Sequence, residues 1–197
     1  MSDIKDLFIF EPHNFLFVGV TNCGKSYLVL NLLETVYKGH FENIVIFCPT
    51  FSYNRTYDRR WLFKDKNVII LNPELVKHHL DKLLSISIEI YKGSKTLFII
   101  DDCGNLADVK QKKSQLSFLG FSGRHFGIST WVLVQKYNSV VKDFRENIRQ
   151  LCLFFCKDEK AISSAFEENA IVPKEFRKLI EERLKDNIIL RHENMRF

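Results

Sequence analysis

The sequence predicts a three-layer α/β fold, in which a mainly parallel sheet lies between two layers of helices, and three observations lead to this prediction. First, short apolar runs alternate along the chain with segments of helical pattern. Second, the run that ends at Val18 leads through a glycine-rich turn directly into a helical segment. Third, the apolar run 97–100 ends in two acids, which is typical of the carboxyl end of a buried parallel strand.

The glycine-rich turn has the pattern G-x-x-x-x-G-K-S, which is the phosphate-binding loop (P-loop) in the strand–loop–helix context that the motif requires. Gly19 and Gly24 allow the backbone to wrap closely around a phosphate. The N–H groups of the loop and the helix N-terminus direct partial positive charge at it. Lys25 is expected to reach the β- and γ-phosphates of ATP, and the hydroxyl of Ser26 to ligate Mg²⁺. The predicted nucleotide-binding residues are Gly19, Val20, Thr21, Asn22, Cys23, Gly24, Lys25 and Ser26.

Polar side chains follow two of the later apolar runs and complete a predicted hydrolytic site. Asp101 and Asp102 form a Walker B pattern, in which Asp101 is expected to hold Mg²⁺, directly or through water. Asp102 is expected to orient or deprotonate the attacking water. Gln135 directly follows the run 128–134 and is expected to face the same edge of the sheet. It either hydrogen-bonds the γ-phosphate or the water, or only caps the end of the strand.

The remaining elements follow from apolar runs, caps and glycines, and together they predict a single domain over 1–197. The segment 54–61 is basic and aromatic; a connecting helix with Trp61 in the core is favoured over a nucleic-acid contact. The further strands are expected at 7–10, 44–48, 68–71, 150–156 and, at an edge, 188–190. The helices are expected at 24–37, from 72–74 to before Gly93, at 114–122, from Asp158 to near Asn169 and from Pro173 to near Asp186, with a short helix or turn at 144–149.

Composition and charge restrict the setting in which the protein works. The chain has no apolar stretch of membrane-spanning length and no secretory signal, so neither a membrane location nor secretion is expected. Five cysteines, an odd number, indicate reduced thiols in an intracellular protein, and Cys152 and Cys156 read as core residues rather than zinc ligands. The stretch 105–142 holds six basic residues against one acid, an excess equal to the net charge of +5 of the whole chain, which favours contact with a polyanion.

The order of the motifs GVTNCGKS, FIIDD, GRHFGIS, WVLVQ and FRENIRQLCLFF resembles the FtsK–HerA superfamily. More narrowly, it is similar to the poxvirus-type genome-packaging ATPases of large DNA viruses and of virophage- and Polinton-like elements. The resemblance covers roughly residues 14–156, followed by C-terminal helices and the edge strand over 157–197. It implies an additional-strand, RecA-like P-loop ATPase fold, in which the strand that carries the sensor residue lies between the P-loop strand and the Walker B strand.

The resemblance also implies roles for individual residues. Gln135 is the implied sensor, and Arg124 is the implied arginine finger that reaches the nucleotide of a neighbouring subunit, with Arg145 and Arg149 as reserves. Two departures stand out. Many members have Glu where this chain has Asp102. There is also little chain beyond the motor domain, so an element that grips DNA or docks on a portal must come from loops or from a partner.

The resulting hypothesis is an ATP-driven motor, an oligomeric ring that pumps double-stranded DNA into a capsid and contacts a capsid or portal vertex protein. The basic loop Lys110–Lys113 is expected to face the pore and contact phosphates. Such a motor is expected in the cytoplasm (virus factory) or the nucleus of the host cell, or in the virion. One alternative is a small P-loop nucleoside or nucleotide kinase, with a lid formed by Arg55, Arg59 and Arg60. Another is a docking module that binds nucleotide without hydrolysing it.

Overall fold

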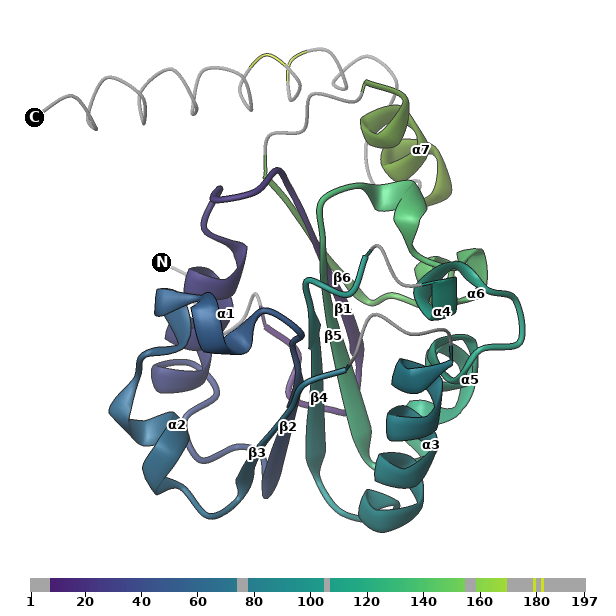
Figure 1. Cartoon of the computed structure of the whole chain (residues 1–197). Coiled ribbons are helices and arrows are strands. Elements are labelled where there is room, and N and C mark those ends of the chain that lie inside the picture. Colours follow the sequence, from purple (N-terminus) through teal and green to yellow (C-terminus); the bar gives the residue numbers. More distant parts are fainter. Residues whose placement is uncertain are drawn as a thin grey trace, which may run out of the picture.

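The computed structural model describes residues 8–73, 78–104, 107–154 and 159–169, together with the single residues 179 and 182. Its centre is a six-stranded sheet in which every neighbouring pair is parallel (Figure 1). The order across the sheet is β3-β2-β4-β5-β1-β6. The strands are β1 (Asn14–Val18), β2 (Asn43–Phe47), β3 (Val68–Leu71), β4 (Thr96–Asp101), β5 (Ile128–Val134) and β6 (Gln150–Leu153).

The strand order places the three predicted motifs at one edge of the sheet. β5 lies between β1 and β4, as the resemblance to additional-strand ATPases implies. The register pairs Val18 with Val134 and Asp101 with Leu133, so these three strands end side by side. The residues that follow them, the P-loop, Asp102 and Gln135, therefore gather at this carboxyl edge, where open parallel sheets bind ligands.

Helices cover both faces of the sheet (Figure 1). One face carries α1 (Lys25–Glu34), α2 (Arg60–Lys64) and the 3₁₀ turns η2 (Phe51–Tyr53) and η3 (Arg55–Tyr57). The other face carries α3 (His79–Tyr91), α4 (Ala107–Lys110), α5 (Gln115–Ser122), α6 (Lys142–Arg145) and α7 (Glu159–Asn169). Two further 3₁₀ turns flank β5, η4 (Gly123–Phe126) before it and η5 (Tyr137–Ser139) after it.

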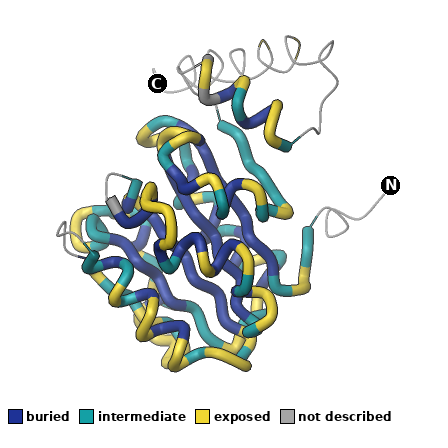
Figure 2. Tube along the Cα trace, turned by 90° about the vertical axis from the view of Figure 1, so that its right-hand side faces the viewer, coloured by how far each residue is buried: buried dark blue, intermediate teal, exposed yellow. Residues whose placement is uncertain are grey.

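Each central strand contributes side chains to two hydrophobic cores, one on either face of the sheet. In β1, Leu16 and Val18 pack towards α3 and α5, whereas Phe15 and Phe17 pack towards α1. Because both faces are covered, the strands read as continuous apolar runs rather than alternating ones. Figure 2 shows the result as tubes that stay buried along the central strands. This arrangement confirms the predicted α/β fold with a parallel sheet.

Several predicted elements differ in extent. Residues 8–10 form no strand; the ring of Phe10 instead packs against Tyr37, whose hydroxyl donates a hydrogen bond to the carbonyl of Ile9. The apolar run thus contributes to an aromatic cluster. The position beside β1, where a strand at 7–10 could have paired, is occupied by β6. α1 ends at Glu34, three residues earlier than predicted at Tyr37. β6 ends at Leu153, and the predicted continuation to residue 156 falls partly outside the described residues.

The other boundaries follow local conformation. α3 begins at His79, preceded by His78 in a left-handed conformation with φ 64°. The predicted start at 72–74 is not observed at residues 72 and 73, which are not helical, and residue 74 lies outside the described residues. Trp61 is half-buried against the core, as predicted, but α2 begins only at Arg60, and residues 55–57 of the predicted connecting helix form the turn η3. The predicted helix from Pro173 and strand 188–190 also lie outside the described residues, so the single-domain organisation of 1–197 stays a prediction. No helix in the described part of the chain has the length and apolarity to cross a membrane.

Candidate active site

The P-loop leaves β1 in a conformation that needs glycine at both ends. A Cβ at Gly19 would lie 2.5 Å from the Cβ of Phe154 and 2.7 Å from the Sγ of Cys23, so no larger residue fits there. Gly24 has φ 99° and Asn22 φ 61°, both in the left-handed region that glycine and asparagine adopt most readily. The backbone N–H of Gly19 donates to the carbonyl of Val134, which fixes the loop to the end of β5.

Lys25 lies inside the curve of the loop that precedes it. Its Nζ donates hydrogen bonds to the carbonyls of Gly19 at 2.8 Å and Val20 at 3.0 Å. The side chain is largely buried, and an ammonium group in such a position costs desolvation unless polar atoms surround it. The loop therefore holds the ammonium at the place where a phosphate bound by the loop N–H groups would meet it.

Asp101 and Ser26 meet directly at the carboxyl edge of the sheet. The Oγ of Ser26 donates to the Oδ2 of Asp101 at 2.6 Å, and the hydroxyl of Tyr57 donates to the same oxygen at 2.5 Å. Burial raises the pKa of the Asp101 carboxyl, while the hydrogen bonds from Ser26 and Tyr57 lower it. A hydroxyl and a buried carboxylate are hard oxygen donors of the kind that Mg²⁺ prefers, and a cation beside them would offset the cost of burying the negative charge.

Asp102 is held by a residue that follows the neighbouring strand, β2. The chain turns at Asp102, which has φ 56°, and its side chain leaves the sheet towards solvent. Its Oδ2 accepts a hydrogen bond of 2.7 Å from the Oγ1 of Thr50, which follows β2. The strained backbone and the hydrogen bond together fix the direction of this carboxylate, as a group that must orient water requires.

Thr50 and Tyr57 contact the two predicted acids, and the sequence analysis does not find these contacts. Both belong to the segment after β2 and reach the two acids from the same side. Their positions become meaningful only once β2 is known to neighbour β4. The available signal was the basic and aromatic composition of 54–61, which pointed to the right segment without indicating a contact with Asp101.

A cavity of about 760 Å³ lies at this edge of the sheet. Lys25, Asp102 and Gln135, which the sequence assigns to phosphate binding, water activation and sensing, all line it. Lys110 at the end of α4, Lys136, and Ser139 of η5 also line it. A smaller cavity of about 410 Å³ adjoins Asp102 and Thr50 and is lined by Tyr53 and Arg55. The structure thus brings the predicted residues together, and their individual roles stay predictions.

The predicted arginines lie in different places. Arg124 is exposed in η4, at the start of β5, and so lies at the edge of the sheet opposite its own P-loop. Arg145 is buried in an ion pair with Glu168, with 10% of its side chain exposed. Arg149 pairs with Glu11 on the surface. Arg124 and Arg149 are therefore both exposed at the sheet edge away from their own P-loop, and Arg149 differs in its ion pair with Glu11.

Of the three arginines proposed for a kinase lid, Arg59 is engaged elsewhere. Arg59 forms an ion pair of 2.7 Å with Glu34 of α1, and its guanidinium lies over the ring of Tyr27. Glu34 also accepts a hydrogen bond from the indole of Trp61. Arg59 thus fastens α2 to α1, and only Arg55 of the three lines a cavity beside the acids.

The position of Cys23 in the P-loop gives a direct chemical test of the site. Its Sγ lies 3.8 Å from the Nζ of Lys25, whereas burial raises the pKa of Cys48 and of Cys152 to about 11 and that of Cys103 well above its usual value. We expect iodoacetamide at neutral pH to modify Cys23 before these three thiols, and bound nucleotide to slow the reaction. Mass spectrometry of tryptic peptides measures both rates. A Cys23 rate that ATP leaves unchanged would contradict the placement of the nucleotide in this loop.

Comparisons with known proteins agree with the fold and the motifs. Residues 4–181 match the sequence profile of the family described as Poxvirus A32 protein. No curated protein sequence matches the chain significantly. Among solved structures, the chain is similar to the genome packaging NTPase B204 from Sulfolobus turreted icosahedral virus 2 in complex with AMP, with 17% identity, 88% of each chain covered and a TM-score of 0.66.

Two further structures show the same fold. The ATP-gammaS complex of the same B204 protein has 19% identity, covers 82% of this chain and 87% of its own, and gives a TM-score of 0.60. The cytoplasmic domain of EssC has 16% identity, covers 77% of this chain and 33% of its own, and gives a TM-score of 0.59. At these identities the likeness establishes the P-loop NTPase fold. Because the family profile spans most of the sequence, the protein belongs to the poxvirus A32 family, which confirms the poxvirus-type assignment drawn from the order of its motifs.

Proposed function

We propose that the protein is an ATP-hydrolysing motor that moves double-stranded DNA into a viral capsid as a ring of identical subunits. Its family membership supports an ATPase of the viral genome-packaging type. Solved structures of the same fold carry AMP or ATP-gammaS, which supports nucleotide binding. The observation that carries the proposal is the cavity in which Lys25, Asp102 and Gln135 converge beside the Ser26–Asp101 pair.

The chain's own groups account for the proposed reaction. The P-loop N–H groups and Lys25 bind the β- and γ-phosphates, and the ammonium exchanges its contacts with Gly19 and Val20 for phosphate oxygens. Asp102 and Gln135 orient a water for attack on the γ-phosphorus, and Asp102 accepts its proton. Mg²⁺, held by Ser26 and Asp101, would neutralise the charge on the phosphate oxygens. The bond between the γ-phosphorus and the oxygen that bridges it to the β-phosphate breaks, and ADP and phosphate leave.

The DNA contact is assigned to Lys112 and Lys113 in the turn between α4 and α5. Both side chains are exposed, and contacts of lysine with phosphates hold a duplex without reading its sequence. Lys110 is a different case, because it lines the cavity of the active site. We further propose that the subunits form a ring that contacts a capsid or portal protein. This motor would work in the cytoplasm or nucleus of the host cell or in the virion.

The test compares ATP turnover and DNA binding in the wild type and in Lys112→Ala/Lys113→Ala. We expect duplex DNA to stimulate wild-type turnover, and the double variant to lose this stimulation while its basal turnover stays unchanged. The affinity for DNA should also fall less steeply with salt in the variant, because fewer counterions are released on binding. A matched control is Lys64→Ala/Lys66→Ala, which removes the same charge from two exposed lysines on the α2 side of the sheet.

The same assay distinguishes the alternatives. If duplex DNA leaves turnover unaffected while a nucleoside or nucleotide is phosphorylated, the protein is a kinase. If ATP binds and is never hydrolysed, with DNA or without it, the protein is a docking module. If the affinity for DNA depends on salt equally in the lysine variant and the wild type, Lys112 and Lys113 are solvated surface charges that do not contact DNA.

A further inference from the structure

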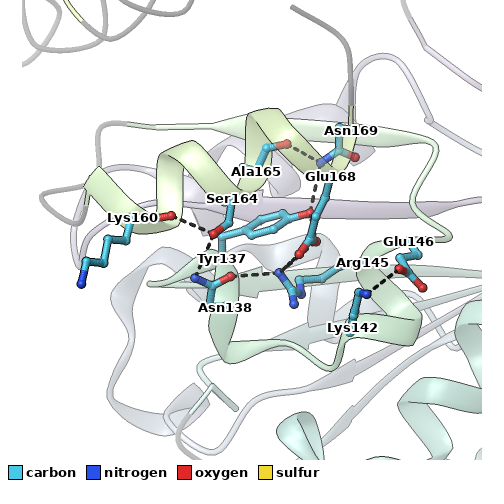
Figure 3. A network of polar contacts seen from close by, with 10 residues as sticks. All are labelled: Tyr137, Asn138, Lys142, Arg145, Glu146, Lys160, Ser164, Ala165, Glu168 and Asn169. Atoms are coloured by element: carbon cyan, nitrogen blue, oxygen red, sulfur yellow. Dashed lines mark hydrogen bonds and ion pairs between the residues drawn. The ribbon is translucent and has the colours of Figure 1, made fainter. Parts of the chain in front are cut away.

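Helix α7 packs against the loop that follows the predicted sensor, Gln135. That loop turns through η5, and its Tyr137 has a ring that is completely buried between β5, α6 and α7. On the helix side, Ile162, Ala165 and Phe166 belong to the same hydrophobic core. A network of hydrogen bonds and an ion pair adds to this apolar contact, as Figure 3 shows from close by.

Tyr137 is bonded to the last turn of α7 through its hydroxyl. The Oη donates to the Oε2 of Glu168 at 2.9 Å and accepts a hydrogen bond from the Nδ2 of Asn169 at 3.0 Å (Figure 3). Burial raises the pKa of Tyr137 to about 12, so its hydroxyl stays protonated and remains a donor at neutral pH. Because Tyr137 lies two residues after Gln135, fixing its ring leaves the intervening backbone little freedom.

Arg145 of α6 completes the network from the other side. Its Nη1 donates to the Oε1 of Glu168 and to the Oδ1 of Asn138, both at 2.9 Å. The guanidinium also lies 4.8 Å from the centre of the Tyr137 ring, within the range of a cation–π interaction. The largely buried Arg145–Glu168 pair therefore connects α6, η5 and α7, and removing one partner would leave a charge without its compensation.

The chain that leads towards α7 touches the active site as well. Phe154 follows β6, and its backbone N–H donates to the carbonyl of Val18 at 2.8 Å. Its Cβ occupies the space beside Gly19 that a side chain there would need. The C-terminal part of the domain thus contacts the P-loop through Phe154 and the sensor loop through Glu168.

We propose that α7 positions the sensor, because the network of Tyr137, Arg145 and Glu168 holds the loop so that Gln135 faces the cavity of the active site. Tyr137 and Glu168 are positioning residues that act through Gln135, and the inference rests on the proposed function for the role of that glutamine. Its consequence is that turnover depends on α7 being docked whereas nucleotide binding does not. A partner that draws α7 away from η5 would stop hydrolysis and leave ATP bound.

The experiment uses two mild variants, Tyr137→Phe and Glu168→Gln, and their combination. Tyr137→Phe keeps the buried ring and removes only the hydroxyl, and Glu168→Gln keeps the shape and removes the charge. The matched control is Glu146→Gln, which makes the same change in the exposed Lys142–Glu146 pair of the same region. For each protein we would measure kcat, the Kd of ATP and the hydrogen exchange of the backbone amides of Ser139 and Val140, which close η5.

Each variant is expected to lower kcat by about ten-fold, the size that follows from losing one hydrogen bond to a charged group. The Kd of ATP should stay at the wild-type value, and the η5 amides should exchange faster while those of β5 do not. The loss of kcat in the double variant, expressed as a free energy, should be smaller than the sum of the two single losses, since the groups act as one network. Glu146→Gln should match the wild type.

Two results would overturn the proposal. One is wild-type exchange of the η5 amides together with wild-type kcat in both variants. The other is an equal loss of kcat, ATP affinity and thermal stability, which would show a role in folding alone. If the wild type hydrolyses no ATP, the proposed function fails separately. Hydrogen exchange of the η5 amides then decides whether α7 holds the loop. Faster exchange in the variants would support this role of α7, and unchanged exchange would contradict it.

Discussion

Asp102→Asn is expected to lower ATP turnover by about 10²-fold or more, the usual scale for the loss of a general base, while nucleotide binding is retained. The carboxylate points from the sheet edge into the cavity and is held there by Thr50, and asparagine keeps this shape but cannot accept a proton. Asp101→Asn should instead weaken Mg²⁺-dependent ATP binding and turnover together, because it removes the buried charge beside Ser26. Turnover and the Kd of ATP with and without Mg²⁺ measure the difference.

The side chains that donate hydrogen bonds to the two acids allow a second test of this division of roles. Thr50→Val removes the bond to Asp102, and Tyr57→Phe removes the bond to Asp101. Each should reproduce the pattern of its own acid at a smaller size, about ten-fold for one hydrogen bond to a charged group. An equal loss of binding in Asp101→Asn and Asp102→Asn would refute the assignment of metal binding to one acid and proton transfer to the other.

The positions of these two acids were predictable because each follows from a local pattern. A parallel strand that is buried on both faces reads as a continuous apolar run, so β2, β3, β4 and β5 were found close to their observed bounds. The polar residue that follows such a run must lie at the carboxyl edge. The P-loop adds a pattern in which the spacing of glycine, lysine and serine is itself the structural requirement.

The contacts that cross the sheet were not predictable from local patterns. Thr50 reaches Asp102 because β2 neighbours β4. The sequence around Thr50 does not indicate which strand pairs with β2. The apolar run at 7–10 was predicted as a strand, and in residues 8–10 it serves instead to cover Tyr37. An apolar run indicates burial, and whether the buried segment pairs as a strand is decided by the sheet edge available to it.

The network around Arg145 shows the same limit at a functional position. The motif order made Arg145 a reserve for the arginine finger, since its type and its place after the sensor strand suit that role. The structure buries it against Glu168, a residue of α7 that is distant in sequence. The free energy of a buried guanidinium depends on a partner carboxylate, and only the fold brings that carboxylate to it.

The largest effect is expected for Arg124, whose replacement by alanine should lower turnover by about 10³–10⁵-fold if it acts as an arginine finger. Arg124 precedes β5, and its own P-loop lies beyond the carboxyl end of that seven-residue strand. At about 3.3 Å per residue, the strand separates the two by roughly 20 Å, which no side chain spans. If Arg124 stabilises the charge that develops on a γ-phosphoryl group, that nucleotide belongs to another subunit.

Mixing two inactive variants tests this arrangement. Lys25→Ala has a defective P-loop and an intact Arg124, and Arg124→Ala has the reverse, so each alone should be nearly inactive. In mixed rings some interfaces would combine the P-loop of one subunit with the arginine of the next, and turnover should partly return. Arg149→Ala tests the reserve candidate, which is also exposed at this edge of the sheet; if Arg124 is the finger, Arg149→Ala should leave turnover near the wild-type value. If labelled subunits exchange and the mixture stays as inactive as its parts, Arg124 does not act across a subunit boundary.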